Sequence, residues 1–407
     1  MKIAMVAECA SPLTELGGEP ASGRTVAVAA VAAALTRAGH HVTVYTRRQD
    51  PHTRTEVPAR EGYRVVHVPA GPPRPLPRDQ VLPFLGEFGT FLRRHWSLRR
   101  PDVVHAHFWM SGLAAELAAR SHELPVVVSF HGLGTVKRRF HGLADPSPRP
   151  RIRFERLIAT RAAQVLATCT DEVNELSRMG IPRFRIAVVP GGVDPALFTP
   201  EGPGDRGRPQ RVLTVGRLVR RKGFDLAVRT LAELPGTELL IAGGAVGDEL
   251  DDGETRRLRR LATDYGVTER LRLLGPIAHT AMPPLYRASD VVLCTPWYEP
   301  FGLVPLEAMA CGRPVVATAV GGMLDTVVDG VTGRLVAPPE PATLARAVRM
   351  LLDDAQLRAR WGAAGRQRVL DTFTWDRVAA ATLRAYEHAI ATQGGSLAAA
   401  PIAAGAR

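Results

Sequence analysis

The segment DVVLCTPWYEPFGLVPLEAMACGRPVVAT, residues 290–318, predicts a strand, a helix and a second strand in close succession. Its apolar ends, 290–294 and 314–318, are short enough to be buried strands. The helix between them is expected from about Leu303 to Ala310, because Pro305 is tolerated in a first turn and Gly312 follows the last one. This order is typical of a parallel sheet covered by helices.

The same alternation of strands and helices runs along the whole chain. Further strands are predicted in the first half at 2–8, 41–46, 63–68, 102–107, 125–130, 165–169 and 185–190, and in the second half at 211–216, 238–243 and 270–275. We therefore expect an α/β protein of two doubly wound, Rossmann-like domains. Their predicted bounds are 1–195, completed by a C-terminal helix at 373–392, then a linker rich in Gly and Pro at 196–210, a second domain at 211–372 and a disordered tail at 393–407.

Bulk composition narrows the classes of function. The chain has 407 residues and a net charge of +12, which would suit an anionic partner. Its basic runs are short and lack interleaved aromatic residues, so no nucleic-acid partner is predicted. Four scattered cysteines argue against a disulfide framework or a zinc site. No apolar run reaches the roughly 18 residues of a membrane span, and a cytoplasmic location is expected.

Unusual residues concentrate where predicted strands end. Ligands of open α/β sheets bind beyond the carboxyl ends of the strands, so these residues are expected to line one cleft between facing domains. They are Gly18 and Gly23 in the loop ELGGEPASGRT (15–25), His107, His131, Arg217, Gly243, Gly244, Glu299, Gly321 and Gly322. The loop precedes a helix expected near Val26, whose first amides could receive a phosphate, although an ordinary turn explains it equally well.

A basic turn, GRLVRRKG (216–223), follows the strand at 211–216. Arg217 and Lys222 can converge on one anion there, whereas Arg220 and Arg221 are expected to be exposed. A solvated basic turn with no ligand is the alternative.

Two acids frame the helix at 303–310. Pro300 keeps Glu299 out of helical geometry, so Glu299 is expected in the loop beside the first amides of the helix, near Phe301, Gly302 and Leu303. Glu307 lies about 7.5 Å from Gly302 along the helix axis, at roughly 1.5 Å per residue. Carboxylates accept hydrogen bonds from vicinal hydroxyls and helix amides donate to phosphate, so a sugar diphosphate fits. The alternative is an acid near the helix dipole with a second, salt-bridged acid.

Two histidines, His105 and His107, alternate on one strand. Metal binding would need a third ligand, and none stands at a supporting spacing. Packing is therefore expected, and no metal site is predicted.

Three motifs together carry a family resemblance over residues 1 to about 390. They are the E-x7-E pair Glu299 and Glu307, GRLVRRKG (216–223) and VVPGGVDPALFTP (188–200). The chain resembles the family 4 retaining glycosyltransferases of GT-B fold. VHAHFWMSG (104–112) and FHGLGTVKRR (130–139) look most like the D-inositol-3-phosphate (mycothiol) glycosyltransferases and the sucrose-phosphate synthases.

The resemblance implies transfer of a hexose from a nucleotide diphosphate sugar to a small hydroxylated acceptor, with a phosphorylated one left open. A UDP-linked donor is favoured over a GDP-linked one, but the sequence leaves both the base and the hexose open. The route would be a front-face displacement without metal or other cofactor. Arg217 and Lys222 would hold the diphosphate, helped by amides of the first Gly-rich loop. Glu299 would hold the hexose, Glu307 the ribose and His131 the O6 side of the sugar.

Departures from the family fall in the acceptor half. The chain has SGRT (22–25) where paired glycines are usual, Phe108 in place of a tyrosine and Gly132 where a threonine is common. Arg78, His107, Phe108, Lys137 and Arg153 are the acceptor candidates. A nucleotide-sugar 2-epimerase and a non-catalytic sugar-nucleotide-binding protein are the alternative functions. Peripheral contact with a membrane and a dimeric state are left open.

Overall fold

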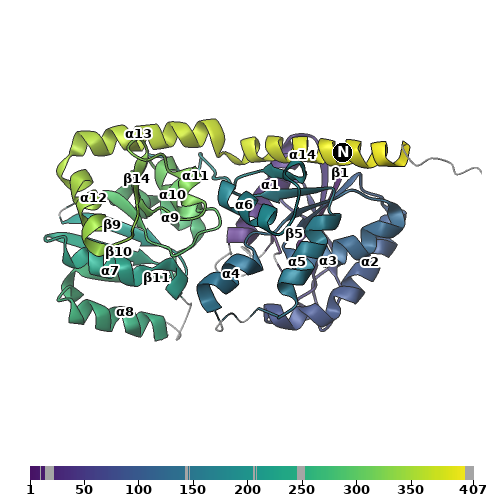
Figure 1. Ribbon diagram of the computed structural model, residues 1–407, viewed down its shortest axis with the longest axis horizontal. Helices are drawn as coiled ribbons and strands as arrows, with labels where there is room; N and C mark the ends of the chain where they lie inside the picture. The colour runs from purple at the N-terminus through teal and green to yellow at the C-terminus, as the bar shows by residue number, and fades with distance from the viewer. Residues whose placement is uncertain are drawn as a thin grey trace, which may run out of the picture.

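The computed structural model describes residues 1–9, 11–13, 23–142, 145, 147–204, 207, 209–244 and 253–398. The chain forms two α/β domains that lie side by side, with the N-terminal half at one end of the molecule and the C-terminal half at the other (Figure 1). The expected fold class, two doubly wound domains, is confirmed.

The N-terminal domain is built on an eight-stranded sheet in the order β3-β4-β2-β1-β5-β6-β7-β8. All neighbours in it are parallel except β3 and β4. The strands are β1 (Lys2–Val6), β2 (His41–Arg47), β3 (Glu56–Pro58), β4 (Arg64–Val68), β5 (Val103–His107), β6 (Val126–Ser129), β7 (Gln164–Ala167) and β8 (Ile186–Val188). β3 is not predicted by the sequence, because this edge strand is short, only partly buried and ends in a proline.

Helices cover both faces of this sheet, and one more reaches it from the C-terminus. They are α1 (Gly23–Arg37), α2 (Leu85–Leu98), α3 (Trp109–Ala119), α4 (Gly134–His141), α5 (Arg151–Arg161) and α6 (Thr170–Arg178), with the 3-10 helix η2 (Arg78–Phe84) before α2. The apolar face of α2, with Phe88, Leu92 and Trp96, packs into the core beside α3. α1 begins at Gly23, one turn earlier than the expected start near Val26.

The C-terminal domain has a six-stranded parallel sheet in the order β11-β10-β9-β12-β13-β14. Its strands are β9 (Gln210–Val215), β10 (Thr237–Ala242), β11 (Leu271–Gly275), β12 (Val291–Cys294), β13 (Val315–Thr318) and β14 (Gly333–Val336). Its helices are α7 (Phe224–Ala232), α8 (Gly253–Asp264), α9 (Met282–Ala288), α10 (Leu303–Ala310), α11 (Met323–Thr326), α12 (Pro341–Asp353) and α13 (Ala355–Thr372). β14 is not predicted by the sequence either, because glycine and arginine interrupt the apolar pattern of this edge strand.

Both sheets are buried on two faces, which explains why their strands are continuous apolar runs rather than alternating ones. In the N-terminal domain, Val6 and Val104 pack beneath α2 and α3, while Met5 and Val44 pack beneath α1 and the last helix. The C-terminal sheet is likewise covered by two apolar clusters. Within the described ranges, no helix combines the length and the apolar character that crossing a membrane requires.

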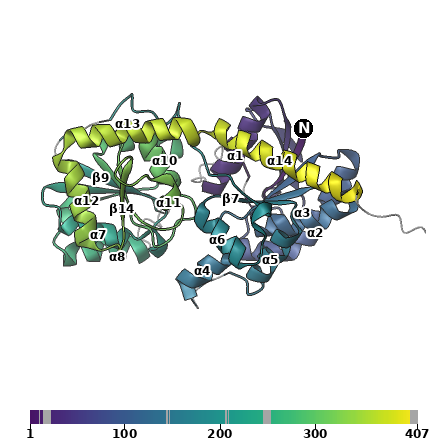
Figure 2. The ribbon, with the colours of Figure 1, turned by 45° about the horizontal axis from the view of Figure 1, so that its top comes forward.

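The last helix, α14 (Trp375–Ala398), crosses back onto the N-terminal domain (Figure 2). Thr374 precedes it, and its Oγ1 accepts a hydrogen bond from the amide of Arg377 at 3.3 Å, as expected for a cap. The tail expected at 393–407 is wrong for residues 393–398, which are helical. Helix extension needs no new nucleus, so two glycines costing about 1 kcal/mol each do not stop it. Residues 399–407 lie outside the described part.

The chain passes between the domains at two places, and the two passing segments are bound to each other. The amide of Val193 donates to the carbonyl oxygen of Phe373 at 2.8 Å, and Val193 also forms a parallel bridge with Thr374. Gly192 lies so close to the ring of Trp375 that a β-carbon there would come within 2.7 Å of it. The first and second crossings therefore form one joined segment.

Candidate active site

The basic turn predicted after β9 is fixed against the end of β12. Gly223, in the left-handed region at φ 66°, ends the turn, and a methyl group there would lie 1.9 Å from the carbonyl oxygen of Thr295. Thr295 Oγ1 donates to the carbonyl oxygen of Gly223 at 2.8 Å. The stem of Lys222 lies against Gly216, at the carboxyl end of β9. The turn therefore presents Lys222 at the edge of the sheet where ligands of this fold class bind.

Lys222 meets Glu299 at that edge. Its Nζ lies 2.5 Å from Glu299 Oε2, and Arg221 Nη1 lies 3.4 Å from the same oxygen. Burial works against ionisation of Glu299, but Lys222 and Arg221 outweigh it and lower the pKa of the carboxyl group. Glu299 is therefore an ionised acceptor of hydrogen bonds.

The exposure expected for the arginines of this turn holds for Arg220 but is wrong for Arg221. Arg221 is only partly exposed, because its guanidinium donates to the carbonyl oxygen of Tyr298 at 2.6 Å as well as facing Glu299. A partner so distant in the sequence gives no local signal. Arg217 lies on the same turn with its side chain exposed.

The loop from Glu299 to Gly302 leads into α10, which spans the predicted residues Leu303–Ala310. Gly302 stands before the helix with φ 92°. The amide of Gly322 donates to the carbonyl oxygen of Glu299 at 2.8 Å, and a methyl group on Gly322 would lie 2.4 Å from the carbonyl oxygen of Phe301. The glycine pair at 321–322 therefore allows a close backbone approach that fixes the loop carrying Glu299.

Glu307 projects from α10 into a nearly closed site, with 7% of its surface exposed. Its Oε1 lies 2.9 Å from Nε2 of His279, and its Oε2 accepts a hydrogen bond from the Tyr286 hydroxyl at 2.5 Å. Both partners were missed from the sequence. His279 stands four residues past β11, and its place beyond a strand end was the signal that could have found it.

Gly243 follows β10 beside the basic turn. A methyl group on it would lie 1.8 Å from the carbonyl oxygen of Gly216, so only glycine fits, and Gly244 follows with φ 131°. Gly18 lies outside the described residues. Gly23 begins α1, and a methyl group there would lie 3.3 Å from the side chain of Leu303 in α10. The first turns of these two helices thus approach one another across the domains.

His131 occupies the matching edge of the N-terminal domain. It follows β6 with φ 56°, and its Nε2 lies 3.0 Å from Nδ1 of His107. Burial and the nearby Arg24 lower the pKa of His131 to about 3, so its ring is neutral. Next to it, a methyl group on Gly132 would lie 3.6 Å from Cγ of Pro300, which places the neighbours of His131 and Glu299 against each other.

Phe108, one of the acceptor candidates, directly follows β5. Its backbone has φ 85° and ψ 157°, a conformation that is rare outside glycine. The guanidinium carbon of Arg24 lies 4.6 Å from the centroid of its ring, and that of Arg151 lies 5.2 Å away. Neither arginine was among the acceptor candidates.

The other acceptor candidates are placed differently. Lys137 pairs with Asp145 at 3.1 Å, and Arg153 points to solvent from α5. Arg151 of the same helix is buried instead, held by Glu155 at 2.7 Å and by the carbonyl oxygen of Gly132 at 2.7 Å. Arg78 begins η2, and its side chain lies outside the description.

Direct contacts hold the two domains together beside this site. The amide and the hydroxyl of Thr170, at the start of α6, donate to the carboxylate of Asp325 at 2.6 and 2.9 Å. Thr168 Oγ1 donates to the carbonyl oxygen of Pro300 at 3.3 Å. The facing edges therefore carry His131 on one side and Glu299 on the other.

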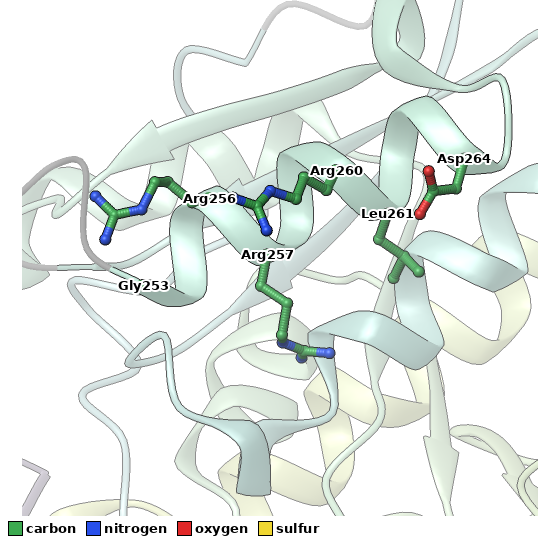
Figure 3. A pocket seen from close by; sticks show the side chains of 6 residues that line it. All are labelled: Gly253, Arg256, Arg257, Arg260, Leu261 and Asp264. Atoms are coloured by element: carbon green, nitrogen blue, oxygen red, sulfur yellow. The ribbon is translucent and has the colours of Figure 1, made fainter.

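Two cavities lie elsewhere. One of about 430 Å³ is lined by α8 residues alone, including Arg256, Arg257 and Arg260 (Figure 3). The other, of about 380 Å³, lies at the opposite end of the N-terminal sheet around Met1 and Asp102. Neither includes a residue of the site described above. Across the ranges that the structure describes, no group of three His, Cys, Asp or Glu side chains could hold a metal ion.

Two facing α/β domains, with a basic turn and paired acids at one sheet edge, define a glycosyltransferase of GT-B fold. The family models agree: residues 21–197 match "Glycosyltransferase Family 4" and residues 199–368 match "Glycosyl transferases group 1". The chain belongs to this glycosyltransferase family, in which the D-inositol 3-phosphate glycosyltransferases are similar to it over almost their whole length.

The similarity to named relatives is extensive. The D-inositol 3-phosphate glycosyltransferase of Xylanimonas cellulosilytica is 36% identical over 95% of this chain and 97% of its own. The sucrose-phosphate synthase of Thermosynechococcus elongatus superposes with a TM-score of 0.85 at 30% identity, over 96% of this chain and 100% of its own. HepE of Anabaena, solved with UDP and glucose, has a TM-score of 0.74 at 22% identity over 95% of this chain and 99% of its own, a likeness of fold. The first two favour the glycosyltransferase over the epimerase and the non-catalytic binding protein.

Proposed function

We propose that this glycosyltransferase moves a hexose from a UDP-linked donor to a small hydroxylated acceptor bearing a phosphate, with retention of configuration and without a metal. The observation that carries the proposal is the contact of Lys222 with Glu299 at the start of α10, with Glu307 held on the next turns of that helix. Cations for a diphosphate and acids for sugar hydroxyls thus stand at one sheet edge.

The donor would lie along this edge with each group opposite its chemical complement. Lys222 has three ammonium protons, so it can hold Glu299 with one and a diphosphate oxygen with another. Arg217, exposed on the same turn, would grip the diphosphate from the other side. Glu299 would accept from hexose hydroxyls and Glu307 from the ribose, while His131 would face O6 of the hexose. The first amides of α10 and the glycines at 243 and 244 would let the donor approach the protein backbone closely.

The reaction needs no protein nucleophile on this scheme. The bond from the anomeric carbon to the diphosphate oxygen breaks, and the acceptor oxygen forms its bond on the same face. The acceptor hydroxyl gives its proton to the departing diphosphate oxygen. Negative charge grows on the leaving group, so Lys222 and Arg217 would stabilise the transition state more than the bound donor.

The acceptor phosphate would bind at Arg24 and Arg151. Both guanidinium groups lie over the ring of Phe108, and both are near His131: Arg24 acts on its pKa, and Arg151 donates to the carbonyl oxygen of the adjacent Gly132. The relatives named for D-inositol 3-phosphate support a phosphorylated acceptor. A cytoplasmic location is proposed as well, since all four cysteines are free thiols.

The test is product formation from a panel of donors and acceptors. The purified chain is incubated with UDP-glucose, UDP-N-acetylglucosamine or a GDP-hexose, together with D-inositol 3-phosphate or inositol. We expect a glycosylated product with the anomeric configuration of the donor, determined by NMR. Epimerised nucleotide sugar, or binding without product, would contradict the proposal. The thermal shift with UDP should exceed that with GDP at equal concentration. A ligand stabilises the folded protein by RT ln(1 + [L]/Kd), so the ligand that binds more tightly gives the larger shift.

Replacing Arg24 tests the acceptor half. Arg24→Leu removes one charged donor to the phosphate, worth about 1.5–3 kcal/mol, so the KM for D-inositol 3-phosphate should rise about tenfold to a hundredfold. The KM for the nucleotide sugar should change little. Arg37→Leu, at the exposed end of the same helix, removes an equal charge and should leave both constants unchanged. An unchanged KM for the phosphorylated acceptor in Arg24→Leu would rule out this binding mode.

Removing metal ions tests the chemistry of the leaving group. We expect full activity after dialysis against EDTA, because the proposed charge stabilisation comes from Lys222 and Arg217. Initial rates are compared before dialysis, after it, and after adding Mg²⁺ or Mn²⁺. Activity that is lost on dialysis and then restored by a divalent ion would show that a metal contributes to stabilising the leaving group.

A further inference from the structure

Three imidazole rings form a row beneath the proposed hexose site. His105 and His107 lie on β5, with ring centroids 4.0 Å apart, and His107 stacks on His131 at 5.3 Å. His105 is fully engaged: its Nδ1 lies 2.7 Å from the Tyr386 hydroxyl of α14 and its Nε2 lies 2.9 Å from Ser129 Oγ. His105 therefore packs as a core residue, as its sequence context predicts.

His107 differs from His105 because only one of its nitrogens is engaged. Nδ1 lies 3.0 Å from Nε2 of His131, while Nε2 is buried and has no hydrogen-bond partner among the described residues. Its side chain is 3% exposed. Burial, with smaller effects of His105, His131 and Arg24, holds the pKa of His107 well below its usual value, so the ring is neutral.

Two neutral rings in hydrogen-bond contact must share one proton between them. If His107 carried its proton on Nε2, a buried N–H would have no acceptor, and such orphaned donors are rare in folded proteins. With the proton on Nδ1, only an acceptor lone pair is left unpaired and the N–H donates to His131. Nε2 of His131 is then an acceptor, so the proton of His131 resides on Nδ1.

We propose that His107 is a positioning residue that fixes His131 as the tautomer protonated on Nδ1, and thereby makes His131 a hydrogen-bond donor to the bound hexose. The inference rests on the proposed function in that His131 faces the sugar. His131 is partly exposed, and Nδ1 is the ring nitrogen that His107 does not engage. Its backbone is held at φ 56° and that of neighbouring Phe108 at φ 85°, so the fold maintains costly geometry at this spot.

The experiment begins with the tautomer, which is independent of turnover. Long-range ¹H–¹⁵N NMR on the selectively labelled wild-type chain reports which nitrogen of His131 carries the proton. We expect Nδ1–H in the wild type. In His107→Asn, the side-chain amide stands near the former Nδ1 and can still donate, so the same tautomer should persist. In His107→Leu, no donor remains and a mixture of tautomers is expected.

The matched kinetic test uses UDP-glucose and D-inositol 3-phosphate. Loss of one neutral hydrogen bond corresponds to about a tenfold fall in kcat/KM, which is the upper limit for His107→Leu because part of His131 keeps its Nδ1 proton in a mixture of tautomers. His107→Asn should stay within about threefold of the wild type, and His107→Gln, whose amide stands one bond further out, should resemble His107→Leu. Thermal unfolding identifies any variant that fails to fold. If one does, the inference is tested by the His131 tautomer that NMR reports in the wild type and in His107→Asn.

Two results would overturn the inference: His131 protonated on Nε2 in the wild-type chain, or equal activity of folded Asn and Leu variants. The variant His131→Ala distinguishes failure of this inference from failure of the proposed function. Full activity of His131→Ala alongside an Nδ1–H tautomer in the wild type would remove His131 from the sugar site and overturn its role as donor, while leaving the rest of the proposed function to the product assay.

Discussion

Lys222→Ala is expected to reduce turnover about a thousandfold while leaving the fold intact. A cation about 4 Å from the charge growing on the diphosphate contributes roughly 4 kcal/mol at an effective dielectric constant near 20. At about 1.4 kcal/mol for each factor of ten, that contribution corresponds to three orders of magnitude in rate. Among the described residues, the change also leaves Arg221, at 3.4 Å, as the one cationic partner of Glu299. The measurement is kcat with saturating UDP-glucose and D-inositol 3-phosphate.

Arg220→Ala provides the matched control. Arg220 lies on the same turn with its side chain exposed, so its removal changes the net charge equally but should alter kcat less than about twofold, as exposed charges at a distance are screened. Circular dichroism and thermal unfolding establish that both variants fold. Near-normal transfer by a folded Lys222→Ala chain would contradict the proposed stabilisation of the leaving group.

Gly223→Ala is expected to lower the free energy of unfolding by about 3 kcal/mol. A residue with a β-carbon in the left-handed region costs about 1–2 kcal/mol, and relieving an overlap with packed atoms costs about 1–3 kcal/mol more. The new methyl group would meet the carbonyl oxygen of Thr295 at 1.9 Å, so either β12 or the turn must move. Because the turn carries Lys222, kcat should fall with stability. Urea unfolding measures the first effect and steady-state kinetics the second.

Gly39→Ala isolates the contribution of the overlap. Gly39 has φ 86°, yet a methyl group there would meet nothing within 4 Å. This variant should lose only the 1–2 kcal/mol or so that the backbone conformation costs, with unchanged kcat. Equal losses of stability at the two positions would show that the contact with Thr295 does not constrain the turn.

The sheets could be predicted from the sequence because strands buried on both faces consist of continuous runs of apolar residues. The strands that escaped, β3 and β14, are edge strands whose pattern is interrupted by proline, or by glycine and arginine. The tail was wrong where α14 continues through its glycines, since each residue added to an existing helix gains a hydrogen bond without a new nucleation cost.

The candidate site likewise contains residues that could be predicted from the sequence and residues that could not. The end of a strand is a local signal, and it placed Lys222 and Glu299 at one edge before their contact was known. Partners chosen by tertiary packing give no such signal. Arg221 turns inward to an acid distant in sequence, and Arg151 rather than Arg153 faces Phe108, because the register of α5 decides which side is buried. The roles of these residues in sugar transfer stay predictions until the variants are measured.

The joined crossing at Val193, Phe373 and Thr374 constrains how the domains can move. Two covalent connections bound to each other would act as a single pivot in any relative motion of the lobes, which would favour rotation about it over sliding of one lobe past the other. The pair Lys222–Glu299 belongs wholly to one lobe and the pair His107–His131 wholly to the other. Swinging the lobes apart would therefore leave both pairs intact, and under the proposed function it would open the space between the two edges to donor and acceptor.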